Sequence, residues 1–162
     1  ATAVDGNKAD VRLKATSKTG TGPAGTTFTD PRTRGSHALI GTSTATQEDI
    51  GSLIVQSAVV TLVKSATVLD PQGGSNAIPG AIITYKLVAN VTGSGSLNNL
   101  SITDAIPAGT VYQAASIELD AVAQTDAADS DAGNFNASLV TVAAGNVPAG
   151  QTRTVTFKVK IP

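Results

Sequence analysis

The sequence contains no cysteine, methionine or tryptophan, and it has a single histidine. Without cysteine, disulfide bonds and thiol chemistry are excluded, and with one histidine a zinc, haem or iron–sulfur site is not expected. Charged residues make up 14% of the chain and the net charge is −1, so no basic surplus favours nucleic acid as a partner. No apolar run approaches the ~18 residues of a membrane span. Function therefore has to be argued from architecture and location.

The beginning of the chain favours an extracellular protein. Ala1-Thr2-Ala3 are small residues of the kind left after a secretory signal is removed. The Ser- and Thr-rich composition without cysteine fits export by a microbe that does not rely on disulfides. An artificial start of the chain would explain the same residues, and the sequence does not separate the two interpretations.

Period-two alternation of apolar and polar residues predicts strands along most of the chain. It is clearest in residues 81–91 and 152–161, where every second side chain is apolar and would face a core. Clusters of Pro, Gly, Asp and Ser interrupt the strands at intervals of roughly a dozen residues, as in an all-β sandwich. No segment carries the apolar period of a helix. The other expected strands are residues 10–15, 37–40, 53–55, 59–64, 97–103, 111–119 and 139–143.

The chain divides into two parts by composition. Residues 58–162 are predicted to form an antiparallel, immunoglobulin-like β-sandwich. Residues 1–57 are predicted to be a polar N-terminal arm, because their sparse apolar residues cannot bury a core of their own. The arm contains one strongly alternating strand, with Val11, Leu13 and Ala15 on one side and charged residues on the other.

Four motifs in residues 58–162 resemble a known repeat. They are Lys64-Ser65 in an early strand, Pro79-Gly80 before a strand with Thr84-Tyr85, Asp104-Ala105-Ile106-Pro107-Ala108-Gly109 leading to Tyr112, and Ala149-Gly150 leading to Phe157. In this order they resemble domain-of-unknown-function family 11. The resemblance implies an immunoglobulin-like module of bacterial or archaeal surface and secreted proteins, with a structural or adhesive role and no catalysis. Members of that family usually resemble tandem repeats with an anchor, whereas this chain has one repeat and a long arm.

The arm suggests that copies of the chain assemble with one another. A sandwich exposes sheet edges with which another strand can pair, and Val11, Leu13 and Ala15 could complete a neighbour's sheet as a donor strand. A head-to-tail contact of this kind does not close, so it builds a filament. We therefore predict a secreted structural subunit of an extracellular filament or surface layer. Two alternatives stay open: an arm that packs on its own domain, and a monomeric surface module that binds a ligand.

Few residues are candidates for chemistry. Asp126, Asp129 and Asp131 lie in one short loop and could hold calcium, but their spacing is not that of an EF-hand, and a solvated turn is the favoured interpretation. No other cofactor is expected. His37 lies in a Gly/Ser/Thr-rich stretch without the pattern of a catalytic triad, and Asp104 is expected to cap the turn before Pro107. We predict no catalytic residue and no enzyme activity.

Overall fold

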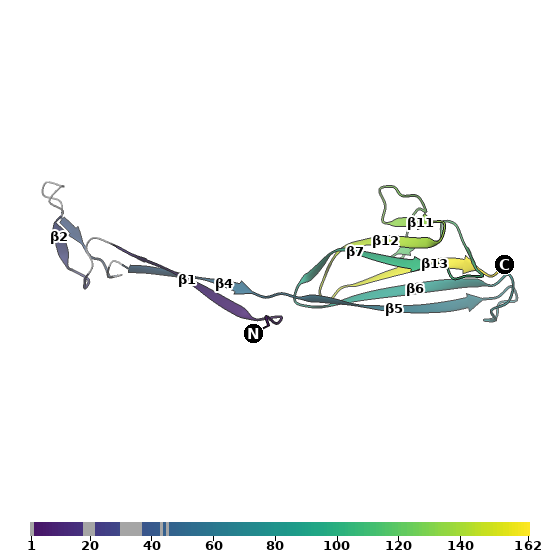
Figure 1. Cartoon of the computed structure of the whole chain (residues 1–162), viewed down its shortest axis with the longest axis horizontal. Helices are drawn as coiled ribbons and strands as arrows, with labels where there is room; N and C mark the ends of the chain where they lie inside the picture. Colours follow the sequence, from purple (N-terminus) through teal and green to yellow (C-terminus); the bar gives the residue numbers. More distant parts are fainter. Residues whose placement is uncertain (1, 18–21, 30–36, 43, 45) are drawn as a thin grey trace. The chain divides into compact units, whose positions relative to one another are not determined.

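The computed structural model describes residues 2–17, 22–29, 37–42, 44 and 46–162. It divides the chain into two compact units, Ala1–Val55 and Gln56–Pro162, two residues before the boundary drawn from the sequence. Every regular element of the described residues is a β-strand, and all strand pairs are antiparallel (Figure 1). The predicted all-β class is therefore confirmed. Among these residues there is no helix that could cross a membrane.

The larger unit is a sandwich of two sheets. The first sheet has the strand order β10-β9-β13-β6-β5, and β8 also pairs with β13. Its strands are β5 (Ala58–Leu69), β6 (Ile82–Gly93), β8 (Val111–Tyr112), β9 (Glu118–Leu119), β10 (Val122–Ala123) and β13 (Thr152–Lys160). The second sheet has the order β11-β12-β7. Its strands are β7 (Ser96–Ala105), β11 (Gly133–Asn136) and β12 (Leu139–Pro148).

The alternating residues of the central strands form the core between the two sheets. Leu87 and Ala89 of β6 and Phe157 of β13 are at most 2% exposed, as the alternation predicts. The second sheet contributes Ile102, Val140 and Val142 to the same cluster. Phe157 packs against Tyr85 with a ring-centroid distance of 5.3 Å. The two strands with the cleanest sequence pattern, β6 and β13, thus supply the first sheet's share of the core.

The described residues of the smaller unit form two antiparallel strand pairs. Strand β1 (Lys8–Thr16) pairs along its whole length with β4 (Thr46–Ile54), and β2 (Thr27–Thr29) pairs with β3 (His37–Leu39). The longer pair, here called the β1–β4 hairpin although β2 and β3 lie between its strands in the sequence, is a two-stranded sheet. The sequence predicts residues 10–15 as a lone extended strand and 53–55 as a short one. The structure instead joins them in one hairpin of nine register pairs, because β4 is longer at its start than the apolar pattern indicates.

One predicted strand is wrong. Residues 111–119 read as a continuous strand, but the structure contains only the two-residue pieces β8 and β9. Between them Ala115 has a φ of 55°, and this left-handed backbone cannot continue a strand. The excursion lets Ile117 become completely buried in the core.

Candidate functional site

The hairpin of β1 and β4 exposes hydrophobic side chains on a two-stranded sheet. One side, here called the apolar face, carries Ala9, Val11, Leu13 and Ala15 of β1, paired with Leu53, Gly51, Asp49 and Gln47 of β4. Val11 is 56% exposed, Leu13 71% and Leu53 66%. Asp49 is the one charged residue among these register pairs. The predicted donor residues Val11, Leu13 and Ala15 therefore do share one face, and this face is uncovered.

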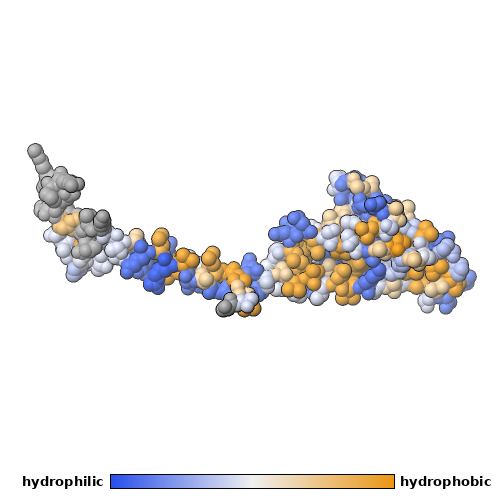
Figure 2. All heavy atoms as spheres, in the orientation of Figure 1, coloured by the Kyte–Doolittle hydropathy of each residue, from blue (hydrophilic) through white to orange (hydrophobic). Residues whose placement is uncertain are grey.

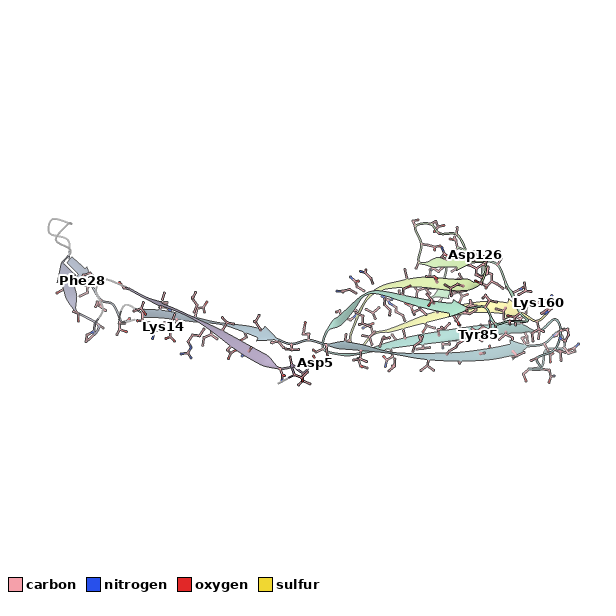
Figure 3. The ribbon with its side chains drawn as sticks, in the orientation of Figure 1. Asp5, Lys14, Phe28, Tyr85, Asp126 and Lys160 are labelled. Carbon is pink, nitrogen blue, oxygen red and sulfur yellow. The ribbon has the colours of Figure 1, made fainter. Side chains whose placement is uncertain are left out.

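On the opposite side of the same hairpin, here called the charged face, the charged side chains form ion pairs with one another. Arg12 and Lys14 both pair with Glu48, at 3.2 and 3.4 Å, and Lys8 pairs with Asp10 at 3.3 Å. The side chains project from both sides of the ribbon in Figure 3, where Lys14 is labelled, and blue and orange residues alternate along the hairpin in Figure 2. The two faces thus differ in charge, although the charged face also exposes Ile50 and Ile54 of β4, at 53% and 61%.

A two-stranded sheet that is exposed on both faces gains little from packing. Such hairpins are marginally stable in water unless a third strand or another layer covers them. Every residue of β1 is exposed. In the described residues, this hairpin therefore has little packing of its own.

The outer strand of the first sandwich sheet, β5, has a complementary feature. Val60 and Leu62 lie opposite Val91 and Ala89 of β6, so they are on the inner face of the sheet, the side that carries the core. Val91 and Ala89 are fully buried, yet Val60 is 39% and Leu62 53% exposed. We call Val60 and Leu62 the uncovered strip. Figure 2 shows hydrophobic residues at the surface along this lower side of the sandwich, where Figure 1 places β5.

The uncovered strip arises because the two sheets differ in width. The first sheet has six strands, whereas the second sheet has three and ends at β7. Among the strands that the structure describes, none pairs with the outer edge of β5 or of β7. Long free edges are the places where a sheet accepts another strand.

An ion pair connects the two edge strands. Lys64 of β5 lies on the inner face and approaches Asp104 of β7 to 2.5 Å, and its ammonium group lies 4.4 Å from the ring centroid of Tyr85, which Figure 3 labels. Asp104 therefore does not act as the expected turn cap but lies within β7. The pair neutralises a carboxylate that points inward at a sheet edge, a feature that otherwise discourages strand addition.

The start of β5 is fixed by the turn between β6 and β7. The Ser57 carbonyl oxygen accepts hydrogen bonds from the N–H groups of Ser94 and Gly95, at 3.0 and 2.8 Å. Gly93 has a φ of 112° and approaches Ser57 so closely that a Cβ atom would overlap its carbonyl oxygen. This contact positions the start of β5, the strand that carries the uncovered strip.

The acidic loop is held together by its own hydrogen bonds. Asp126 accepts the Tyr112 hydroxyl at 2.5 Å and the Ala115 N–H at 2.8 Å. Asp129 and Asp131 accept bonds from Thr125 and from backbone N–H groups of the loop. Among the described residues there is no group of three or more His, Cys, Asp or Glu that could hold a metal ion. The calcium site therefore stays a prediction.

Tyr112 links this loop to the core. Its ring stacks on Phe135 with a centroid distance of 3.9 Å. Burial, followed by the hydrogen bond to Asp126, raises the pKa of Tyr112 to about 12. The sequence shows Tyr112 as a motif residue and Asp126 as a candidate ligand, but nothing in their spacing indicates that the two side chains meet.

A pocket of about 460 Å³ lies on the sandwich beside the ends of β5 and β13. Its polar lining includes Thr84, Gln113, Ser116, Glu118 and Lys158. Glu118 accepts a hydrogen bond from Thr156, and no His lies among the lining residues. The lining is therefore that of a polar surface depression and contains no nucleophile paired with a base.

Comparison with protein-family models, with curated proteins and with solved structures finds no match to this chain. The resemblance to the surface repeat family stays a prediction. The features that bear on function are the apolar face of the hairpin and the uncovered strip of β5.

Proposed function

We propose that this chain is an exported, noncatalytic structural subunit that assembles with copies of itself into an extracellular filament or surface layer. The mechanism is strand addition, in which the β1–β4 hairpin of one copy completes the sandwich of the next. The observation that carries the proposal is the exposure of Val11, Leu13 and Leu53 on a sheet of only two strands. Hydrophobic side chains that alternate along a strand are the pattern by which added strands are recognised.

The geometry favours an open polymer over a closed dimer. The donor hairpin and the edges β5 and β7 are different surfaces of the same chain, so each copy offers one of each. A contact between two different surfaces is head-to-tail, and it propagates unless its rotation closes a ring.

Two substitutions on opposite faces of the hairpin test the mechanism. Leu13→Lys places a charge on the apolar face, and Ile50→Glu places one on the charged face. Leu13 lies opposite Asp49, and Ile50 lies opposite Arg12, so each new charge faces an opposite charge across the hairpin and both hairpins should form. The two variants differ only in which face they alter.

The expected difference follows from burial. Burying the side chain of Leu13, now 71% exposed, is worth about 1.5 kcal/mol, and 1.4 kcal/mol is a factor of ten in binding. We expect filaments of the unmodified chain by negative-stain microscopy, a critical concentration raised about tenfold or more by Leu13→Lys, and little change with Ile50→Glu. Dispersed particles of the unmodified chain at all concentrations would refute the polymer and favour the monomeric module.

A further inference from the structure

We infer that the incoming hairpin adds to the free edge of β7 and lays its apolar face over Val60 and Leu62 of β5. In this arrangement the donor of a second copy becomes the fourth strand of the second sheet. The inference rests on the proposed function and names the acceptor site for it. It follows from which sheet edges are long enough, which inner side chains lack cover, and which face of the hairpin is apolar.

Edge length selects the acceptor. The sheet ends at β10 and β11 are two and four residues long, whereas β5 has twelve residues and β7 has ten. The donor strand β1 has nine residues and needs an edge of similar length to form a full ladder. Only the side of the sandwich with β5 and β7 offers such an edge.

The exposure of Val60 and Leu62 then favours the edge of β7, rather than the edge of β5, as the place where the strand is added. A strand added to the edge of β5 would widen the first sheet further and leave Val60 and Leu62 exposed. β7 contacts β5 across the sandwich, as the ion pair of Lys64 and Asp104 shows, so a strand added to the free edge of β7 would extend the narrower sheet along β5. Only this addition buries side chains that belong to the core face and are now 39% and 53% exposed.

The alternation of the donor fits this position. A strand that completes a sandwich has one face toward the core and one toward water. The apolar face of the hairpin, with Val11 and Leu13, would contact the uncovered strip, while Arg12 and Lys14 would remain in solvent with their partner Glu48.

The two surfaces carry few charges. Asp49 is the single charge on the apolar face of the hairpin, and Lys64, which lies two residues beyond Leu62 on the inner face of β5, already pairs with Asp104 of β7. Both surfaces are therefore mainly hydrophobic, and the hairpin of a second copy supplies an apolar face of strand length that matches the uncovered strip.

A substitution pair on β5 tests the acceptor. Leu62→Glu alters the inner face of the strand, and Val63→Glu alters the outer face at a residue that is 63% exposed. We expect Leu62→Glu to raise the critical concentration at least tenfold and Val63→Glu to leave it within about twofold of the unmodified chain. Normal filaments from Leu62→Glu would overturn the acceptor assignment and leave the proposed function intact.

Mixing two defective variants separates donor from acceptor. A Leu62→Lys variant keeps its hairpin, and Leu13→Lys keeps its acceptor. Because both new charges are positive, the two altered surfaces do not attract each other, and an equimolar mixture should form dimers that do not grow. Absence of this dimer would overturn the assignment, provided that each variant keeps the thermal unfolding of the unmodified chain. Absence of filaments from the unmodified chain would instead refute the proposed function, and the inference with it.

The lack of cysteine allows a readout that does not depend on a disruptive substitution. Copies carrying Leu62→Cys, mixed with copies carrying Leu13→Cys, should be joined by a short bismaleimide, since the natural chain contributes no thiol. The control pairs Val63→Cys with Leu13→Cys and should remain unlinked. Equal crosslinking in both mixtures would contradict contact through the inner face of β5.

Discussion

Replacement of Gly93 by alanine should destabilise the sandwich far more than the same replacement at Gly109. Both glycines have positive φ angles, 112° and 80°. A Cβ atom at Gly109 would meet no atom within 4 Å, whereas at Gly93 it would overlap the Ser57 carbonyl oxygen and lie 3.3 Å from the Cα atom of Ala58. The two substitutions therefore share the backbone strain and differ in the steric clash.

The structure gives the size of the difference. A left-handed backbone costs a residue with a Cβ atom about 1–2 kcal/mol, and this is the whole expected effect at Gly109. At Gly93 the Ser57 carbonyl must also move, which weakens the two hydrogen bonds that it accepts from Ser94 and Gly95. Each such bond contributes about 1 kcal/mol net, so we expect a loss of about 3–5 kcal/mol at Gly93.

Urea unfolding followed by tyrosine fluorescence measures this loss in the right part of the chain. Tyr85 and Tyr112 are the only tyrosines, the chain has no tryptophan, and both tyrosines belong to the larger unit. Equal losses of unfolding free energy for the two variants would refute the argument that Ser57 holds β5 against the β6–β7 turn. A smaller loss at Gly93 than at Gly109 would refute it more strongly.

Three further predictions concern the polar groups of the sandwich. The hydrogen bond from the Gly74 N–H is the largest cause that lowers the pKa of Asp70 in the folded protein. The ionised carboxylate therefore stabilises the fold above the unfolded pKa of 3.8, and this stabilisation is lost as the pH falls through the folded pKa. Asp70→Asn should accordingly make the free energy of unfolding depend less on pH in the acid range. Tyr112 should ionise near pH 12 in an ultraviolet titration, and Asp126→Asn should lower that pKa only in part, because burial is the larger cause. Chelation with EDTA should leave Tm unchanged, since the carboxylates of Asp126, Asp129 and Asp131 already accept hydrogen bonds; a fall in Tm that calcium reverses would contradict this.

The strands that the sequence predicts best are those whose alternation coincides with burial on one face. In β6 and β13 the apolar residues face the core and the intervening ones face water. The alternation of apolar and polar residues therefore predicts both strands nearly to their ends. The reading fails at residues 111–119, where the turn at Ala115 is set by contacts with Asp126 from a distant loop. The sequence pattern also misses the partner of β1. That partner, β4, lies thirty or more positions away from the residues it pairs with, and it carries polar side chains along its first half.

Coverage of a strand is the property that sequence alone does not specify, and here it is the property on which the proposed function depends. The sequence predicts strands both at residues 59–64, with Val60 and Leu62, and at residues 81–91, with Leu87 and Ala89, and in the structure all four side chains lie on the inner face of one sheet. Whether a core side chain is covered depends on how many strands the facing sheet contains, which is a matter of topology. The facing sheet ends at β7, so Leu62 stays more than half exposed while Ala89 beside it is buried. The same chain has a hairpin whose apolar face lacks cover, and one contact between copies would supply what both surfaces are missing.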